Sequence, residues 1–262
     1  MTHVSAVPAY PVGHNLLAGK TILITAAAGT GIGFATAKRC IEEGAQVFVS
    51  DIHERRLAEA CDKLRAIPGS VVGSLVCDVT NESQVQSLVR AAIDAHGGID
   101  VLVNNAGLGG SALVVDMTDE QWSRVIDVSL TSVFRMTRAV LPHMYSRKSG
   151  VIVNNASVLG WRGQVLQAHY AAAKAGVMAF TRCSALEAAE HGVRINAVAP
   201  SIAMHQFLNR VTSDELLADL RQREAFGRTA ETWEVANVIV FLASQLSSYM
   251  TGEVVSVSSQ QA

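Results

Sequence analysis

The sequence predicts a single-domain α/β protein, in which a doubly wound parallel β-sheet carries helices on both faces. Strand-like and helix-like segments alternate along the chain, which is the pattern of a parallel sheet. The strand-like runs are apolar without strict alternation, as strands buried on both faces should be. A length of 262 residues suits one α/β domain, and a hydrophobic fraction of 49% suits a large buried sheet.

Short apolar runs such as TILI (residues 21–24) and QVFVS (residues 46–50) mark the strands. In chain order we expect strands near residues 20–25, 46–50, 71–77, 100–104, 150–155, 193–198 and 253–257. Longer helix-like segments separate them, near residues 32–43, 53–66, 82–96, 118–147, 167–190, 205–223 and 231–244. Residues 1–18 contain two prolines and a glycine, which predict a loose N-terminal arm. Residues 19–262 are expected to form the domain.

A glycine-rich turn, TAAAGTGIG (residues 25–33), joins the first strand to the first helix. Glycines at such a turn let the backbone approach a pyrophosphate, which then sits at the positive end of the helix dipole. A tight turn required by packing alone is the alternative. The residues expected to contact a dinucleotide here are Thr25, Gly29, Thr30, Gly31, Ile32 and Gly33.

Asp51 closes the second strand, where a dinucleotide site requires an acid. A carboxylate at this position accepts hydrogen bonds from the adenosine ribose and repels a 2′-phosphate. It therefore predicts NAD as the cofactor. Arg55 and Arg56 follow closely, so NADP is the alternative; a solvated helix start would also explain these two arginines.

Tyr170 and Lys174 stand four residues apart in an alanine-rich helix, and Ser157 lies thirteen residues upstream. Residues four apart share a helix face. A free tyrosine titrates near pH ~10, and a neighbouring ammonium should lower that pKa. The spacing therefore predicts an acid/base able to exchange a proton with an alcohol or carbonyl. Two ordinary residues of an amphipathic helix are the alternative for this spacing taken alone.

From residue 19 onward the chain resembles the short-chain dehydrogenase/reductase family. The matching segments are the glycine turn, CDV (77–79), NNAG (104–107), NNAS (154–157), Tyr170 with Lys174, RINAVAP (194–200), VFLAS (240–244) and YMTGE (249–253). The resemblance implies a single Rossmann-type domain with a seven-stranded parallel sheet. It also implies NAD(P)-dependent interconversion of a secondary alcohol and a ketone by hydride transfer.

The resemblance also implies roles for individual residues. Ser157 would hold the reacting oxygen, and Lys174 would bind the nicotinamide ribose and lower the pKa of Tyr170. The remaining cofactor contacts are Asp78 and Val79 at the adenine, Asn105, Ala106 and Gly107 along the adenosine, and Pro200 and Ile202 beside the nicotinamide. Turn formation is the alternative for Asp78 and for residues 105–107, because Asp, Asn and Gly gather at strand ends anyway.

Three departures from the family pattern concern the same site. Ser129 stands where an asparagine usually supports a proton relay, and its hydroxyl can still donate and accept. We therefore include it with the catalytic residues and expect a modified relay. Ser201 replaces a glycine and His205 a threonine beside the nicotinamide. The glycine turn has one residue more than usual, with Ala26 at a customary glycine.

Residues that could contact a substrate are Trp161, Arg162, Leu108 and Phe207: three apolar walls and a cation for a carboxylate or a coenzyme A phosphate. Segments TAAAGTGIG, DIHERR, NNASVLGWR and GVRINAVAPSIA resemble actinobacterial steroid-catabolism dehydrogenases. That resemblance implies a bulky alicyclic substrate, the CoA-thioester remnant of the steroid C and D rings. The alternatives are a 3-oxoacyl-(acetoacetyl-)CoA or acyl-carrier-protein reductase using NADPH, and a non-catalytic dinucleotide-binding regulator.

Charge and cysteine usage narrow the partners. The net charge of −2, without a basic block, argues against nucleic acid. Cys40, Cys61, Cys77 and Cys183 lack metal-ligand spacing, so no metal is expected and we interpret them as small buried residues of a reducing cytoplasm. No run approaches the roughly 20 apolar residues that span a bilayer. The family resemblance implies a homotetramer, which the small residues of the Tyr170 helix would allow.

Overall fold

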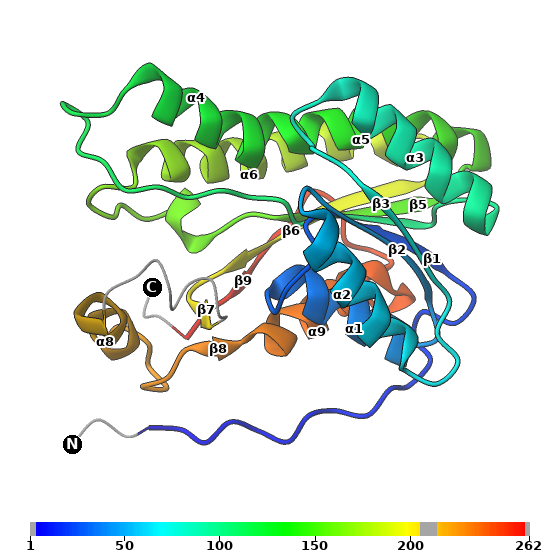
Figure 1. Ribbon diagram of the computed structural model, residues 1–262, viewed down its shortest axis with the longest axis horizontal. Coiled ribbons are helices and arrows are strands. Elements are labelled where there is room, and N and C mark those ends of the chain that lie inside the picture. The colour runs from blue at the N-terminus through cyan, green and yellow to red at the C-terminus, as the bar shows by residue number, and fades with distance from the viewer. Residues whose placement is uncertain (1–3, 205–213, 260–262) are drawn as a thin grey trace.

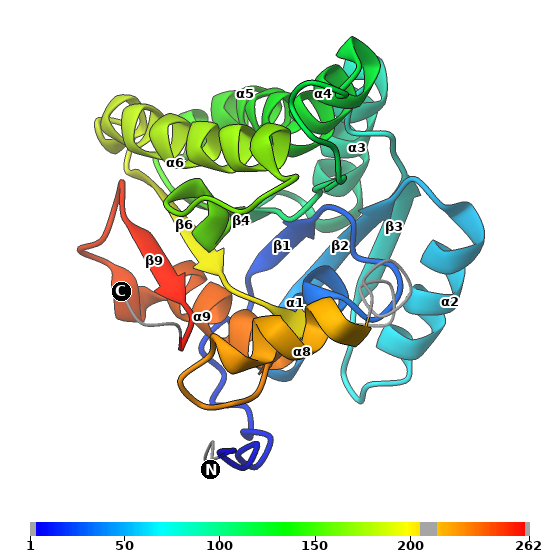
Figure 2. The same ribbon diagram turned by 90° about the vertical axis from the view of Figure 1, so that its left-hand side faces the viewer.

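The computed structural model describes residues 4–204 and 214–259. Seven parallel strands form one sheet in the order β3-β2-β1-β4-β5-β6-β9. Helices α1, α2 and α9 cover one face of this sheet, and α3, α5 and α6 cover the other (Figures 1 and 2). The predicted fold class, an α/β domain with a doubly wound parallel sheet, is confirmed.

The strands of the sheet are β1 (Thr21–Ile24), β2 (Gln46–Asp51), β3 (Val72–Val76), β4 (Val101–Asn104), β5 (Gly150–Asn155), β6 (Val193–Pro200) and β9 (Val254–Val257). All four residues of both β1 and β4 are buried. The edge strands β3 and β9 are only partly covered. Burial on both faces was therefore the wrong expectation for those two strands, because each has a neighbour on one side only.

The helices that cover the sheet are α1 (Ile32–Glu42), α2 (Glu54–Arg65), α3 (Glu82–His96), α5 (Ser132–Arg147), α6 (Ala168–Ala189) and α9 (Thr232–Ala243). One apolar core lies between the sheet and the α1, α2 and α9 layer, and includes Ile24, Val49 and Ile239. A second core, including Leu102 and Met136, lies on the opposite face. Apolar side chains are therefore packed on both faces of the sheet.

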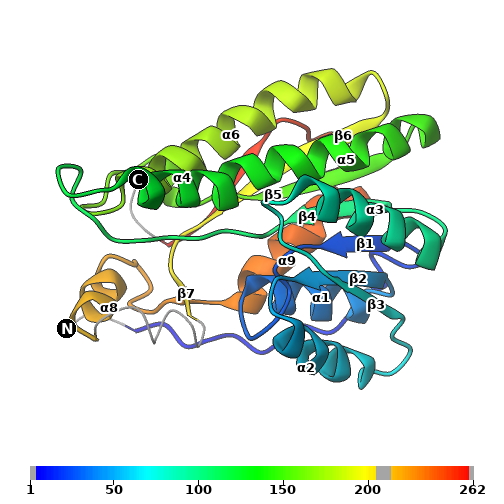
Figure 3. The same ribbon diagram turned by 45° about the horizontal axis from the view of Figure 1, so that its top comes forward.

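The single helix expected near residues 118–147 is three helical pieces. The α-helix α4 (Asp119–Ile126) passes through the π-helical turn η1 (Asp127–Thr131) into α5, and the pieces follow one line in Figure 3. The wider π-turn places an extra residue in the helix at this point, where such turns often accompany functional sites. Ser129 lies inside it and is fully buried.

Beyond β6 the chain forms smaller elements. Strand β7 (Ala203–Met204) pairs with β8 (Ala230–Glu231), and α8 (Asp214–Gln222) lies between them in sequence. The expected helix 205–223 is therefore observed from residue 214. Its first part, with His205 and Phe207, lies outside the described residues.

Part of the N-terminal arm is held against α1, where the sequence predicted a loose segment. The backbone N–H groups of His14 and Leu16 donate to the carboxylate of Glu43, which also pairs with Arg39. The Tyr10 hydroxyl donates to Glu42 over 2.7 Å. Glu43, which is almost fully buried, and Glu42 therefore hold residues 10–16 against the end of α1.

The cysteine prediction needs one correction. Cys40, Cys61 and Cys77 are buried, whereas Cys183 is exposed on α6. Helix α6 buries only one side against the sheet, and Cys183 lies on another. No helix within the described ranges combines the length and apolar character needed to cross a membrane.

Candidate active site

Ser157 and Tyr170 come together at the carboxyl end of β5. Ser157 precedes the 3-10 turn η2 (Val158–Gly160), and its Oγ accepts a hydrogen bond from the backbone of Leu159. Tyr170 occupies the first turn of α6, which starts at Ala168. The Ser157 hydroxyl lies close enough to the phenol of Tyr170 to lower its pKa. Two residues thirteen apart in sequence thus present neighbouring oxygens.

Lys174 lies one helical turn beyond Tyr170 and is 2% exposed. Its Nζ donates to the backbone carbonyl of Asn155 over 2.6 Å and lies 5.5 Å from the centre of the Tyr170 ring. A Cβ at Gly107 would come within 3.3 Å of Nζ, so the glycine leaves room for the ammonium. The structure therefore brings Ser157, Tyr170 and Lys174 into one cluster.

Burial dominates the titration of both groups. It raises the pKa of Tyr170 above its ordinary value, although the nearby Ser157 hydroxyl acts in the opposite direction. Burial also lowers the pKa of Lys174 to about 8. The expected lowering of the Tyr170 pKa is thus wrong for the protein by itself, since removal of the phenolate from water outweighs the favourable contact.

Ser129 holds the segment that borders this cluster. Its Oγ donates to the carbonyl of Leu108 and accepts from the Leu108 N–H, both over 2.9 Å. A Cβ at Gly107 would lie 3.9 Å from the same Oγ. The π-turn therefore points a short hydroxyl at the backbone directly after Gly107, where the family pattern has a longer amide.

The glycine turn leaves open space at the start of α1. Gly31 is the N-cap residue, no side chain caps the helix, and its first turn contains no acidic residue. Within the described ranges no atom would approach a Cβ at Gly29 or Gly31 within 4 Å, so packing among these residues does not explain the two glycines. Positive φ explains Gly29, at 86°. An uncapped, open helix N-terminus fits the pyrophosphate of a dinucleotide.

Gly33 has a different role from its neighbours. A Cβ there would collide with the carbonyl oxygen of Ala26 and lie 2.5 Å from Asn105 Nδ2. It therefore lets α1 pack against the turn. Ala26 itself adopts φ 51°, a left-handed conformation that favours glycine. Thr30 and Ile32 lie between these glycines, and Thr25 begins the turn.

Asp51 lies beside the glycine turn at the end of β2 and is 8% exposed. Its carboxylate accepts from the N–H groups of Ala28 and His53, at 3.3 and 3.0 Å. Arg56 approaches to 4.0 Å. Burial raises the pKa of Asp51, and the Ala28 N–H and the Arg56 guanidinium oppose the rise. The acid is thus placed next to the turn, as an adenosine ribose site requires.

The other expected cofactor contacts follow neighbouring strands. The Asp78 carboxylate accepts from the backbone and hydroxyl of Thr80, so it forms a turn. Val79 is buried beside it. The Thr25 hydroxyl accepts from the N–H groups of Asn105 and Ala106, which ties the glycine turn to the end of β4. Hydrogen bonds within the protein therefore already occupy Asp78 and the backbone N–H groups of Asn105 and Ala106.

Pro200 ends β6, and Ile202 accepts a backbone hydrogen bond from Ala230 over 2.9 Å. The Ser201 N–H donates to Val257 over 3.1 Å. This segment is consequently anchored between the end of the main sheet and the β7–β8 pair, in line with the carboxyl ends of β5 and β6.

Sequence reasoning missed Asn155 as a member of the site. Its Nδ2 donates to Asn105 Oδ1 over 3.0 Å, and its backbone carbonyl holds Lys174. The preceding Asn154 points to the opposite face and bonds Asn104 and Thr181. The sequence did contain a signal for this residue, because two adjacent asparagines end an otherwise apolar strand.

The residues expected at the substrate differ in exposure. Trp161 is 50% exposed, and Leu108 and Arg162 are partly buried. Leu108 lines a cavity of about 250 Å³, together with Arg124 and His169. Phe207 lies outside the described residues.

Two neighbouring segments carry exposed apolar side chains. The backbone of Ala112 donates to the carbonyl of Leu166, so the segments 112–115 and 165–166 lie side by side. We call them the apolar lip; its exposed side chains are Leu113, Val114, Val115, Val165 and Leu166.

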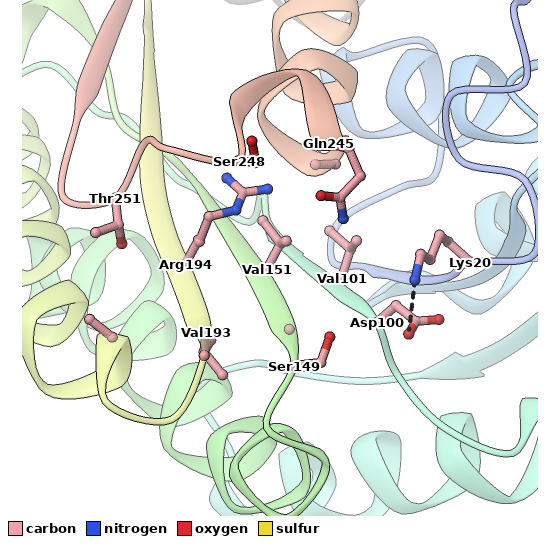
Figure 4. Close-up of a pocket in the computed structure, with 14 residues that line it drawn as sticks. Lys20, Asp100, Val101, Ser149, Val151, Val193, Arg194, Gln245, Ser248 and Thr251 are labelled. Atoms are coloured by element: carbon pink, nitrogen blue, oxygen red, sulfur yellow. Dashed lines mark ion pairs between the residues drawn. The ribbon is translucent and has the colours of Figure 1, made fainter.

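A larger cavity, of about 350 Å³, lies at the other end of the sheet (Figure 4). Lys20 and Asp100 form an ion pair of 3.8 Å in its wall. Arg194 reaches into the same region from β6 and donates to the carbonyls of Leu242 and Ser244, at the end of α9. It serves as a helix cap there, and this cavity is remote from the Ser157 cluster.

Comparison with known proteins agrees with this geometry. The family model described as enoyl-(acyl carrier protein) reductase matches residues 26–259. A (5R,7aS)-5-hydroxy-7a-methyl-1-oxo-2,3,5,6,7,7a-hexahydro-1H-indene-carboxyl-CoA reductase of Mycobacterium tuberculosis is 61% identical, over 98% of this chain and 99% of its own. A 3-oxoacyl-(acyl-carrier-protein) reductase of Thermotoga maritima is 41% identical, over 92% of this chain and 97% of its own.

Solved structures show the same fold. A short chain dehydrogenase from Mycobacterium smegmatis superposes with a TM-score of 0.88 at 58% identity, covering 98% of this chain and 99% of its own. Levodione reductase gives a TM-score of 0.88 at 34% identity, covering 93% and 97%. The motifs and these relatives agree along nearly the whole chain, and the protein belongs to the short-chain dehydrogenase/reductase family of oxidoreductases.

Proposed function

We propose that the protein interconverts a ring hydroxyl and a ketone on a bulky alicyclic acyl-CoA thioester, with NAD as its cofactor. The observation that carries the reaction type is the grouping of the Ser157 hydroxyl, the Tyr170 phenol and the buried Lys174. The substrate class is inferred from the Mycobacterium tuberculosis relative, whose name gives a hexahydroindene-carboxyl-CoA as its substrate.

In the direction of reduction, Ser157 donates a hydrogen bond to the ketone oxygen and holds it next to the Tyr170 hydroxyl. A reduced nicotinamide cofactor, held by the glycine turn, Asp51 and Lys174, would supply the hydride for this reduction. Because burial raises the pKa of Tyr170, its phenol is protonated at neutral pH and can donate its proton to the developing alkoxide. Oxidation is the reverse, with Tyr170 accepting the proton.

Lys174 has two roles in this proposal. Its Nζ binds the ribose hydroxyls on the nicotinamide side, and its charge favours the phenolate that forms when Tyr170 gives up its proton. With a pKa of about 8, the ammonium is charged at neutral pH. The hydrogen bond from Lys174 Nζ to the backbone carbonyl of Asn155 holds the ammonium at the end of β5.

The surroundings of the cluster suit an apolar ring system. Trp161 and the apolar lip offer exposed hydrophobic surface that an alicyclic substrate would cover. We place Leu108 and Phe207 as further walls, and Arg162 as the contact for a CoA phosphate. The remaining residues proposed for cofactor contact are those of the glycine turn, Asp51, Asp78, Val79, residues 105–107, Pro200 and Ile202.

A linear 3-oxoacyl thioester with NADPH is the second candidate, because the Thermotoga maritima relative acts on 3-oxoacyl groups. Asp51 opposes it, since a buried carboxylate beside the glycine turn repels a 2′-phosphate. A regulator without catalysis is opposed by the intact Ser157–Tyr170–Lys174 cluster.

The test follows the ultraviolet absorbance of the reduced cofactor, with bicyclic and linear CoA thioesters and with NAD(H) and NADP(H). We expect turnover of bicyclic substrates with NAD(H), and a Tyr170→Phe variant about 10²- to 10⁴-fold slower with unchanged NADH affinity. Turnover confined to linear 3-oxoacyl thioesters with NADPH would reject the proposed substrate. Full activity in Tyr170→Phe would reject the mechanism.

We further propose a cytoplasmic homotetramer. Phe134 on α5 and Leu186 on α6 are 41% and 76% exposed, so both helices carry apolar surface available to another copy. The free, buried Cys40 and Cys61 suit a reducing compartment. Sedimentation equilibrium distinguishes a tetramer from the monomer that would contradict this assembly.

A further inference from the structure

The side-chain oxygen of Asn155 is a buried acceptor to which no group in the described part of the chain donates. Asn155 ends β5, two residues before Ser157. Its Oδ1 has almost no contact with solvent and no hydrogen-bond partner among the described residues. A buried acceptor left without a donor costs free energy, so such atoms usually meet a ligand or an ordered water.

The network around Asn155 fixes which way its amide points. Asn105 Nδ2 donates to the carbonyls of Thr25 and Ala26, at 3.1 and 3.0 Å. The other terminal atom of Asn105 is therefore an oxygen, and Asn155 must turn its own Nδ2 toward it, as observed at 3.0 Å. A flipped Asn155 would set two oxygens against each other. Its Oδ1 is consequently committed to a donor from elsewhere.

That donor has to enter between the glycine turn and Lys174. On one side, Asn105 connects Asn155 to Thr25 and Ala26 of the turn. On the other side, the Asn155 carbonyl accepts from Lys174 Nζ over 2.6 Å. Successive strand residues face opposite ways, and Asn154 faces α6, where its Nδ2 donates to the Thr181 hydroxyl. Asn155 thus presents its side chain to the face that the turn shares.

We propose that Asn155 is a positioning residue for the nicotinamide half of the dinucleotide. Its Oδ1 accepts a hydrogen bond from that half, which offers two kinds of donor, the ribose hydroxyls and the carboxamide N–H. Its backbone carbonyl at the same time aims Lys174. This inference rests on the proposed dinucleotide binding, and it adds a residue that connects the two ends of the cofactor site.

The test compares the wild type with Asn155→Leu, which has nearly the same shape but no acceptor. Isothermal titration calorimetry measures the dissociation constants of NADH, ADP-ribose and ADP. ADP is the matched control, because it carries only the adenosine half. We expect about tenfold weaker binding of NADH and unchanged binding of ADP.

The ADP-ribose measurement identifies the donor. Weaker binding of ADP-ribose in the variant assigns the ribose hydroxyls, and unchanged binding assigns the carboxamide N–H. An equal loss for ADP and NADH would mean that Asn155 acts only by packing the glycine turn through Asn105, and would overturn the proposal. Unchanged NADH affinity would overturn it too, because a water would then satisfy Oδ1.

Two controls separate failure of this inference from other failures. Circular dichroism and thermal unfolding show whether Asn155→Leu folds; Asn155→Ser, which also removes the amide oxygen, replaces it if it does not. If the wild type binds NADPH and not NADH, the same comparison of wild type and variant is made with NADPH in place of NADH. A wild type that binds neither dinucleotide overturns the proposed function as well as this inference.

Discussion

Replacing Lys174 with methionine should abolish a pH dependence of stability that the wild-type protein shows above neutral pH. The folded protein holds Lys174 with a pKa of about 8, against 10.5 for an ordinary lysine. Between these values the unfolded chain keeps a proton that the folded chain has lost. The free energy of unfolding therefore rises with pH across this range, because the unfolded state binds more protons there.

The size of the effect follows from the same two values. Each unit of pKa difference corresponds to about 1.36 kcal/mol. From about pH 7 to about pH 9.5 the wild type should gain about 2 kcal/mol relative to Lys174→Met. The range stops short of Tyr170, whose pKa burial raises above its ordinary value. Below about pH 7 both states are protonated, so the difference between the two proteins should level off.

Urea unfolding curves measure this difference, at one protein concentration because an oligomer unfolds in a concentration-dependent way. Wild type and Lys174→Met are compared at several pH values, and the unfolding free energies are subtracted. The subtraction cancels the other titrating groups, which both proteins share. A difference that stays flat with pH would refute the reasoning, since it would mean that Lys174 keeps an ordinary pKa in its buried position.

Three substitutions test other parts of the structure. Ala26→Gly should raise the unfolding free energy by about 0.5–1 kcal/mol, because Ala26 has φ 51°; a urea curve that shows no gain would contradict the strain. Gly33→Ala should lower it by about 1–3 kcal/mol, since the new Cβ would lie 2.5 Å from Asn105 Nδ2, and an unchanged melting temperature would argue against that contact. Arg194→Leu should lower the unfolding free energy by about 1–3 kcal/mol, because the carbonyls of Leu242 and Ser244 at the end of α9 would lose their donor. Calorimetric unfolding measures this loss, and an unchanged unfolding free energy would show that water replaces the guanidinium.

Local sequence patterns were enough to predict the order of strands and helices along the chain. They were also enough to predict the residues proposed at the centre of the site. The apolar run at residues 21–24, the glycines that follow and the acid at Asp51 form a strand, a turn and a strand end, each defined over a few neighbouring residues. The spacing of Tyr170 and Lys174 is likewise a property of a single helix. Periodicity and turn chemistry act over such short distances, so the sequence predicts them directly.

Titration behaviour was decided by the tertiary structure. The sequence places an ammonium near a phenol and so predicts a lowered pKa for Tyr170. In the folded protein both groups are removed from water, and the cost of burying a charge outweighs their proximity. Spacing along a helix carries no information about how much protein surrounds it.

Contacts between distant segments were decided in the same way. Asn105 and Asn155 are 50 residues apart, and only the pairing of neighbouring strands places one amide against the other. The π-turn that turns Ser129 toward Leu108, and the partial exposure of the edge strands β3 and β9, also depend on which elements become neighbours. The sequence by itself determined the elements and the side chains proposed to react, because these follow from local patterns. The tertiary structure decided how deeply those side chains are buried and what they touch, because both depend on packing across the whole sheet.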